Sequence, residues 1–283
     1  GRAIGLVLAL VLITLPPLGV IGWANPVTAA GVLFPGTGFA GLGLLCAVWV
    51  VFALGRFRAV ASLAVIAAAA NAVAVFQPAP AVHNWRGQDT AYGRLGTGPD
   101  AALAAYGRLL DLQDLAAALP PATVMVLPET LVGRYTSATT RVLDSTVAEL
   151  RAKRSVVLVG AELADADGRL DNVLLALGTP DVIRQRIPIP VGMWRPWAAD
   201  SYSMHLDGRG VALVAGRRIA PLICYEQLLV LPVLVSMANG ADTLVGAAND
   251  WWARGTSAPV IQQQAMSAWG RLFGVPVVRA TNL

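Results

Sequence analysis

The chain has 283 residues, of which 56% are hydrophobic, and a formal net charge of +4 at pH 7. This hydrophobic content is too high for an ordinary soluble domain, and the length suffices for one sizeable core plus a membrane portion. The basic residues are scattered along the chain, with no basic run beyond 151–154, so the composition gives no support to nucleic-acid binding.

The first part of the chain consists of two stretches without charged residues or histidine, 3–55 and 59–82. About 20 apolar residues cross the hydrocarbon core of a membrane, so we expect three transmembrane spans. They fall at roughly 3–22, 38–55 and 59–77, and Pro16-Pro17 would kink the first. A cleaved signal peptide could imitate the first segment, but two further spans follow it.

The positions of the arginines predict the topology. Arg2 precedes the first span, and Arg56 and Arg58 separate the second from the third, so the positive-inside rule places all three in the cytoplasm. Residues after Gln77 are then periplasmic, in a multi-pass protein of a bacterial inner membrane. We expect a membrane domain over 1–78 and a periplasmic domain over 79–283. The chain begins with glycine and stops just after an apparent strand, so we expect a piece of a longer protein whose second domain is incomplete at its C-terminal end.

The second domain alternates short β-like runs with helical patterns, which is typical of an α/β fold. Strands are expected at 123–127, 155–163, 172–178, 182–189, 210–215, 218–224, 242–248 and 275–280. Helices are expected at 100–118, 137–154, 226–238 and 257–273. Several strands between 155 and 224 leave no room for helices, so hairpins are needed there, as at 165–168.

Several familiar motifs carry no weight. Residues 36–41 match G-x-G-x-x-G, but they lie between apolar spans and not after a strand. His83 and His205 are far apart and have no partner at metal-ligand spacing, so we expect no metal and no cofactor. No G-x-S-x-G motif is present, and Cys46 and Cys224 lie in environments too different for a disulfide.

Two residues with chemical potential stand at the ends of apolar strands. Glu129 follows Met-Val-Leu-Pro, where partial burial would raise the pKa of its carboxyl group toward that of a general base. Cys224 closes another strand and precedes a helix expected to begin near Glu226, whose dipole could stabilise a thiolate. Taken alone, Glu129 is more often part of a structural turn and Cys224 more often a core residue.

Together, these positions resemble the nitrilase, or carbon-nitrogen hydrolase, superfamily. Leu127-Pro128-Glu129-Thr130 is similar to that family's glutamate motif, and Ile223-Cys224-Tyr225-Glu226 to its cysteine motif. The segments 248–252, which includes Asn249, and 279–282 resemble the apolipoprotein N-acyltransferase branch. The resemblance implies an α-β-β-α sandwich preceded by transmembrane helices. It also implies a catalytic glutamate, lysine and cysteine.

The lysine motif is where this sequence differs. Arg184-Gln185-Arg186-Ile187-Pro188 overlays it with Arg186 in the lysine's place, whereas an anchor on Pro190 puts Gln185 there. Side chains alternate along a strand, so this one-residue ambiguity decides which group faces the cysteine. The stretch, with the following Met193–Trp197 segment, looks most like the TraB conjugal-transfer group. The single lysine, Lys153, ends a surface-type helix and cannot readily substitute.

The resemblance implies cysteine-dependent acyl transfer or amide hydrolysis. Glu129 would be the base, Cys224 the nucleophile and Arg186 the oxyanion stabiliser, because arginine supplies charge but cannot shuttle a proton. Tyr225, Glu226, Asn249 and Gln185 would be supporting groups. The expected partners are the lipid bilayer, an acyl or amide substrate that is plausibly lipid-linked, and the conjugation machinery. The alternative is a catalytically impaired conjugal-transfer or envelope-assembly factor that acts by binding.

Overall fold

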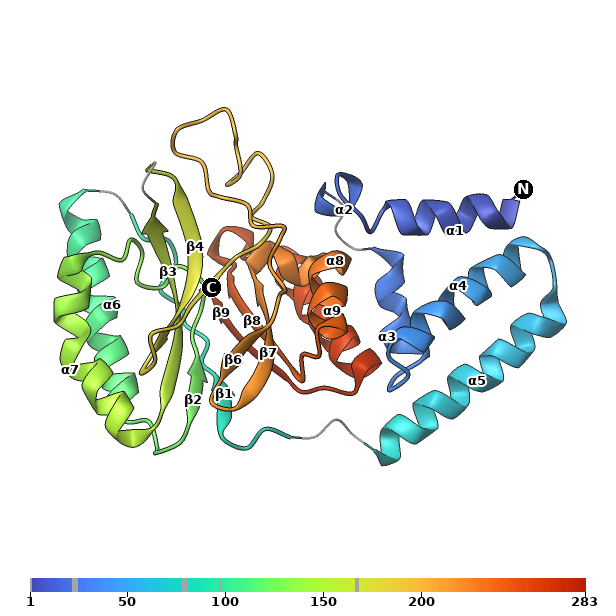
Figure 1. The fold of residues 1–283 in the computed structure, drawn as a ribbon, viewed down its shortest axis with the longest axis horizontal. Coiled ribbons are helices and arrows are strands. Elements are labelled where there is room, and N and C mark those ends of the chain that lie inside the picture. Colours follow the sequence, from blue (N-terminus) through green and yellow to red (C-terminus); the bar gives the residue numbers. More distant parts are fainter. Residues whose placement is uncertain (1, 22–24, 78–80, 97, 166–167) are drawn as a thin grey trace.

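The computed structural model describes residues 2–21, 25–77, 81–96, 98–165 and 168–283. Two β-sheets lie face to face, with helices on the outer face of each, which gives four layers (Figure 1). Helices α6 (Pro99–Ala117) and α7 (Ser137–Lys153) cover the first sheet, and α8 (Val230–Ala238) and α9 (Ala258–Phe273) cover the second. The expected α-β-β-α arrangement is therefore present in this part of the chain.

The first sheet has the order β1-β2-β3-β4-β5. Its strands are β1 (Trp85–Gly87), β2 (Val124–Val126), β3 (Val156–Ala164), β4 (Leu170–Leu177) and β5 (Val182–Arg184). The first three strands are parallel, and β3, β4 and β5 pair antiparallel. This antiparallel pairing confirms the hairpins that the sequence requires, although residues 166–167 of the predicted turn lie outside the described residues.

The second sheet has the order β6-β7-β8-β9. Its strands are β6 (Ala212–Val214), β7 (Arg217–Ile223), β8 (Thr243–Asn249) and β9 (Val277–Asn282). Strands β7, β8 and β9 are parallel, so their carboxyl ends lie at one edge of the sheet. The inner faces of the two sheets share one apolar core, which includes Leu158 and Leu174 from the first sheet and Val245 from the second. Cys224 belongs to this core, between the sheets.

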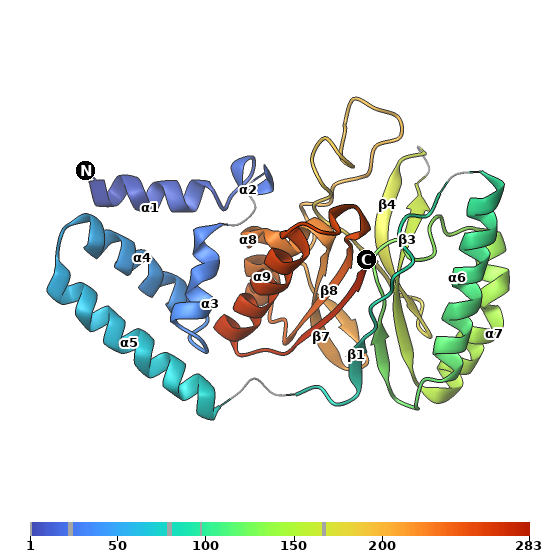
Figure 2. The same cartoon turned by 180° about the vertical axis from the view of Figure 1, so that it is seen from behind.

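The described residues up to Gln77 form a helical region outside α9 (Figure 2). It contains α1 (Arg2–Leu12), α2 (Leu18–Ile21), the 3-10 helix η1 (Pro26–Ala29), α3 (Ala30–Leu33), α4 (Phe39–Ala53) and α5 (Phe57–Phe76). Phe34 and Leu45 are buried in the same cluster as Trp269 and Leu272 of α9. The helical region is thus packed onto the outer helix layer of the two-sheet domain.

The membrane prediction is supported for one helix. Among the described residues, α5 has the length and apolar composition needed to cross a membrane, and α4 is apolar but has 15 residues. The segment expected as a first span, with an interruption at Pro16-Pro17, consists of α1, which ends at Leu12, and α2, which begins at Leu18, because prolines lack the N–H groups that a helix uses. Residue 22 and the predicted domain boundary at 78–79 lie outside the described residues.

Two local predictions also need correction. Strand β1 was not expected, because its sequence Trp-Arg-Gly carries no alternating apolar pattern. The helix expected from 226 begins at Val230 in α8, and a short 3-10 helix, η2 (Cys224–Leu228), precedes it. The dipole of a long helix is therefore not available at Cys224.

Candidate functional site

Glu129 lies in the turn that follows β2, and its side chain is buried with 4% of its surface exposed. The turn packs closely on β3, where a Cβ at Gly160 would clash with the backbone of Pro128, Glu129 and Thr130. Glycine at this position therefore lets the turn approach the sheet. Thr130 has a left-handed backbone with φ of 47°, which is uncommon for a β-branched residue and marks a constrained turn.

Cys224 lies directly after β7 and is 5% exposed. Its φ is 51°, so it too has the left-handed conformation that costs a non-glycine residue free energy. Its carbonyl accepts a 2.7 Å hydrogen bond from Nε2 of the buried Gln262 in α9. The thiol lies close enough to the carboxyl group of Glu129, which follows a strand of the first sheet, for each group to change the pKa of the other.

The carboxyl and thiol groups each have a raised pKa. Burial raises the pKa of Glu129 to about 7, and hydrogen bonds from Cys224 and Asn172 oppose this effect. Burial, followed by the charge of Glu129, raises the pKa of the Cys224 thiol well above its usual range. The backbone N–H of Asn249 donates to the pair and lowers both values. The resting pair is a neutral thiol beside a carboxyl group that exchanges its proton near neutral pH.

Gln185 is the residue of the Arg-Gln-Arg stretch that bonds to the neighbours of this pair, Asn172 and Ile223. Its backbone N–H donates to the Asn172 carbonyl at 2.8 Å, which continues the pairing of β4 and β5. Asn172 Nδ2 donates to Glu129 Oε1 at 2.6 Å and to Gln185 Oε1 at 2.9 Å. Gln185 Nε2 donates to the Ile223 carbonyl at 2.8 Å, next to Cys224. A neutral amide therefore links Asn172, the partner of Glu129, to the strand end that precedes Cys224.

Arg186 faces the other way, as alternation along an extended chain requires. Its guanidinium donates to the carbonyls of Pro232 at 3.2 Å and Pro221 at 3.4 Å, and its Nε lies 3.4 Å from Glu226 Oε1. No contact found among the described residues joins it to Glu129 or Cys224. The expectation that Arg186 faces the thiol is corrected here, because the register presents Gln185 instead.

Glu226, expected as a supporting group, holds the backbone together. Its Oε2 accepts from the Ile223 N–H at 2.9 Å, and its Oε1 accepts from the N–H groups of Arg186 at 3.0 Å and Ile187 at 3.3 Å. Burial raises the pKa of this carboxyl group, and Arg186 together with these amides counteracts that effect. Glu226 thereby fixes the end of β7 against the residues that follow β5.

The other two supporting candidates have different partners. The side chain of Asn249 donates to Thr130 Oγ1 at 2.8 Å and accepts from Asn282 Nδ2 at 2.8 Å, so it braces the turn that carries Glu129. The Tyr225 hydroxyl donates to the Val20 carbonyl at 2.9 Å, in the helical region. Tyr225, the residue after Cys224, thus connects the site to the helical region through its side chain. Its backbone N–H belongs to the first turn of η2.

Sequence reasoning missed Asn172 and Gln262. Asn172 occupies an otherwise apolar strand, and a buried polar residue in such a strand is a detectable signal because it needs a partner. Gln262 lies 38 residues beyond Cys224 and no sequence motif links the two. Glu162 and Tyr202 were also not singled out, although their side chains hydrogen-bond each other and the charge of Glu129 acts on Tyr202.

The described residues contain no cluster of three or more His, Cys, Asp or Glu side chains that could hold a metal ion. The ring of His205 instead lies 2.7 Å from Oδ1 of Asp171. The other oxygen of this carboxyl group, Oδ2, accepts a hydrogen bond from Arg184 Nε. The candidate site therefore consists of a thiol, a carboxyl group and two amide side chains.

These observations define the class of protein as a layered two-sheet α/β protein with a buried cysteine–glutamate pair. No protein-family model matches the chain. The conjugal transfer protein TraB of Agrobacterium fabrum is 38% identical over 290 residues, a match that covers 100% of this chain and 67% of that protein. The probable conjugal transfer protein TraB of Sinorhizobium fredii is 36% identical over 294 residues, covering 97% and 71%. The chain belongs to the TraB family of conjugal transfer proteins.

Similar solved structures come from the carbon-nitrogen hydrolases. A carbon-nitrogen hydrolase from Helicobacter pylori is 15% identical with a TM-score of 0.48, covering 70% of this chain and 72% of that chain. A mutant of an amidase of the nitrilase superfamily from a Nesterenkonia species is 15% identical with a TM-score of 0.42, covering 72% and 79%.

Proposed function

We propose that this protein is a membrane-anchored enzyme that uses Cys224 for acyl transfer or for hydrolysis of an amide C–N bond. The observation that carries the proposal is the buried pair of the Cys224 thiol and the Glu129 carboxyl group, which act on each other's pKa, and the pKa of about 7 of Glu129 suits a general base. Backbone strain at Cys224 supports it further, because such strain gathers at functional sites.

In the proposed reaction, the Cys224 sulfur attacks the carbonyl carbon of an acyl donor while Glu129 takes the thiol proton. The tetrahedral oxyanion then collapses to a thioester, and the leaving amine takes the proton from Glu129. Water or an acceptor amine next loses a proton to Glu129 and attacks the thioester, and the departing thiolate recovers that proton. The Tyr225 backbone N–H is the proposed oxyanion donor, because the first N–H groups of a helical turn have no partner within it.

In this proposal Gln185, the second of the two residues that align with the lysine position, supports the reacting pair, and Arg186 does not. Its amide holds Asn172 and the Ile223 carbonyl, and so positions the carboxyl group and the strand end that carries the thiol. It supplies no charge, so the thiolate and the oxyanion would receive less electrostatic stabilisation than a lysine gives. We therefore expect a slower reaction than a site with a cation would support.

The neutral Gln185 also favours a second candidate function. In this alternative, the domain is a catalytically impaired conjugal-transfer or envelope-assembly factor that acts by binding. The retained Glu129–Cys224 pair argues for the enzyme. A buried carboxyl group without a cation lowers the stability of the fold, and a protein that only binds its partners would gain nothing from keeping it.

We further propose anchoring in the bacterial inner membrane through several spans, with the two-sheet domain in the periplasm and 1–78 as the membrane domain. The length and composition of α5 support anchoring, and the exposed apolar side chains of Phe52, Phe57, Val75 and Phe76 extend that surface. Arg56, which precedes α5, and Arg58, in its first turn, support a cytoplasmic location for the connection between α4 and α5. The proposed partners are the bilayer, a lipid-linked acyl or amide substrate and the conjugation machinery.

The test is trapping of an acyl adduct with p-nitrophenyl acetate, followed by mass spectrometry of the thiol peptides. Cys46→Ala serves as the background, so that Cys224 is the one remaining thiol. The enzyme forms an acetyl-Cys224 thioester that disappears with time, whereas Glu129→Gln slows its formation by a factor of about 100 or more. A Cys224 that remains unmodified, or that is modified equally fast in Glu129→Gln, would support the binding factor instead.

A further inference from the structure

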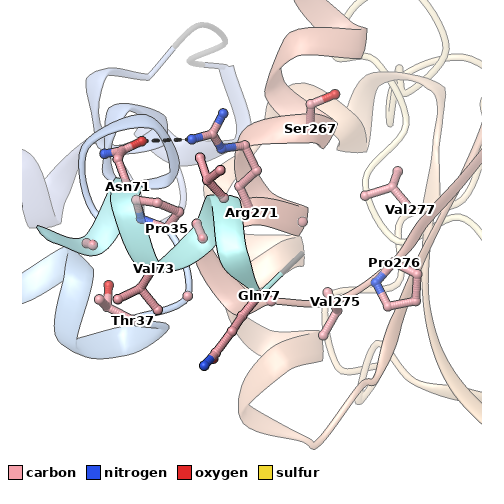
Figure 3. Close-up of a pocket in the computed structure, with 16 residues that line it drawn as sticks. Pro35, Thr37, Asn71, Val73, Gln77, Ser267, Arg271, Val275, Pro276 and Val277 are labelled. Atoms are coloured by element: carbon pink, nitrogen blue, oxygen red, sulfur yellow. Dashed lines mark hydrogen bonds between the residues drawn. The ribbon is translucent and has the colours of Figure 1, made fainter. Parts of the chain in front are cut away.

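A cavity of about 660 Å³ lies where the helical region meets the two-sheet domain (Figure 3). Its walls are the last turns of α5, the segment 35–37 and the end of α9 with residues 274–277. The backbone N–H of Gly36 donates to the Arg271 carbonyl at 2.7 Å, so the segment 35–37 caps the carboxyl end of α9. The cavity is therefore bounded by hydrogen-bonded, packed elements on two sides and by α5 on the third.

Asn71 is the residue that attaches α5 here. Its Nδ2 donates to the carbonyls of Val32 and Leu33, each at 3.1 Å, and its Oδ1 accepts from Arg271 at 2.9 Å. These bonds tie one turn of α5 to α3 and α9. No residue of α5 is buried, so a polar clamp, with little apolar packing around it, holds the helix at this point.

Arg271 supplies the cation of the cavity. The Arg271 guanidinium carries five N–H groups. Within the part of the chain that the structure describes, it makes one hydrogen bond, to Asn71. No acidic residue lines the cavity. The guanidinium therefore keeps donors and a positive charge for an anionic group, which it binds well when that group is a phosphate.

The remaining walls are largely apolar. Val73 and Ala74 of α5 line the cavity on one side, and Val275 and Val277 line it after α9; Val73, Val275 and Val277 are labelled in Figure 3. Val75 and Phe76 are 76% and 84% exposed, so the apolar wall continues onto the open surface of the helix. An anion site that opens onto an apolar helix surface matches the shape and polarity of a phospholipid, with its charged head and its acyl chains.

We propose that this cavity binds one anionic phospholipid, with its phosphate on Arg271 and the start of an acyl chain along Val73 and Val277. The inference rests on the proposed membrane anchoring through α5 and does not depend on chemistry at Cys224. Arg271 lies nine residues after Gln262 on α9, which is about 13 Å along a helix axis, so the lipid site is separate from the thiol site. The bound lipid fills the space between α5 and α9 that protein side chains leave open.

The experiment uses the full chain in phosphatidylcholine nanodiscs that contain spin-labelled phosphatidylglycerol or spin-labelled phosphatidylcholine. Electron spin resonance measures the fraction of each label that is motionally restricted by the protein. The wild-type chain retains phosphatidylglycerol preferentially, and Arg271→Gln lowers this preference about fivefold. The matched control is Arg58→Gln, which removes an exposed arginine at the other end of α5 and leaves the preference unchanged.

A second pair of variants tests the cavity without changing its charge. Ala74 lines the cavity whereas Ala72 is an exposed residue of the same helix that does not. Ala74→Trp fills the cavity, so the motionally restricted fraction of spin-labelled phosphatidylglycerol disappears. Ala72→Trp leaves this fraction unchanged. The lipid site is overturned if both tryptophan variants retain the same fraction of restricted label. It is also overturned if soluble glycerol phosphate displaces the restricted label as well as a phospholipid does.

Alkaline carbonate extraction separates this inference from the proposal on which it rests. Release of the wild-type chain from membranes overturns the anchoring itself, and the lipid site with it. A chain that stays in the membrane but shows no preference for phosphatidylglycerol overturns the lipid site alone.

Discussion

Two buried carboxylic acids, Glu129 and Glu226, lie on opposite sides of the Arg-Gln-Arg stretch and have different surroundings. Glu226 accepts from three backbone N–H groups and lies 3.4 Å from the Arg186 guanidinium. Glu129 has a thiol and the Asn172 amide as side-chain partners, and burial raises its pKa to about 7. The two residues that follow β5 therefore differ: Arg186 brings a cation to Glu226, whereas Gln185 bonds to Asn172, the amide partner of Glu129.

The difference separates a structural acid from one that can transfer protons. The donors and the guanidinium around Glu226 favour its ionised form and oppose the burial that raises its pKa, because an ionised carboxylate only accepts hydrogen bonds. A buried carboxyl group without a cation changes protonation state near neutral pH. We therefore interpret Arg186–Glu226 as the pair that maintains the fold and Glu129–Cys224 as the pair that reacts.

The largest expected effect comes from breaking the structural pair. Arg186→Met leaves the Glu226 carboxylate buried without its cation, and we expect a loss of about 3–5 kcal/mol in the free energy of unfolding. The measurement is urea unfolding of the full chain in detergent micelles.

The neighbouring arginine provides the matched control for this change. The Arg184 side chain is 50% exposed and pairs with Asp171, so Arg184→Met should cost no more than about 1 kcal/mol. Adding Glu226→Gln to Arg186→Met should recover part of the loss, because it removes the unpaired charge. Similar costs for the two single arginine variants would contradict the distinction between the carboxyl groups.

The next effect is a dependence of stability on pH that arises from Glu129. The pKa of this group is raised from 4.5 to about 7 in the folded state, so the folded chain binds its proton more tightly than the unfolded chain. This contribution to stability is fully present below pH 4.5 and is lost as the pH rises through 7. The wild-type chain should lose about 3 kcal/mol relative to Glu129→Gln over that range.

The measurement is the unfolding free energy of both chains at several pH values from 4 to 8. Glu149→Gln, at an exposed position of α7, is the control substitution. A constant difference between wild type and Glu129→Gln across that range would show that Glu129 stays ionised, and would remove the case for it as a base.

The sequence allowed much of this arrangement to be predicted, because apolar strands that end in a polar residue are a strong local signal. Glu129 and Cys224 were both found in this way, and so were the outer helices and most strands. The register at 184–186 could not be resolved from sequence, since a shift of one residue exchanges the two faces of a strand. Pairing with β4 resolves it, through the bond between the Gln185 N–H and the Asn172 carbonyl.

The remaining differences also have local causes. The sequence of η2 is compatible with a helix, but Leu229 has an extended backbone and separates it from α8. The burial of Arg186 depends on carbonyls of Pro221 and Pro232, which are 35 and 46 residues away in the chain. Contacts of such sequence separation leave no periodic pattern, so they cannot be read from a single sequence.

The smallest expected effect tests the residue that separates the two carboxyl environments. Gln185→Lys would place an ammonium group beside Glu129 and Asn172, near the thiol, and an opposite charge at that range lowers the pKa of an acid by about 1–3 units. The thiolate fraction at pH 7 rises accordingly, but a less basic thiolate is also less nucleophilic. For a decrease of about 2 units, these two effects give a net increase of about tenfold in the rate of alkylation by iodoacetamide.

The rate is measured in the Cys46→Ala background, with Gln185→Met as the control that removes the amide without adding charge. Gln185→Met should react no faster than the parent chain, because it leaves the thiol without a cation. If Gln185→Lys folds, as judged by its urea unfolding curve, and reacts no faster than Gln185→Met, then Gln185 does not face the reactive pair. If the alkylation rate increases in Gln185→Lys and not in Gln185→Met, the new ammonium group acts on the Glu129–Cys224 pair. That single substitution would then supply Glu129 with a cation, as Arg186 supplies one to Glu226.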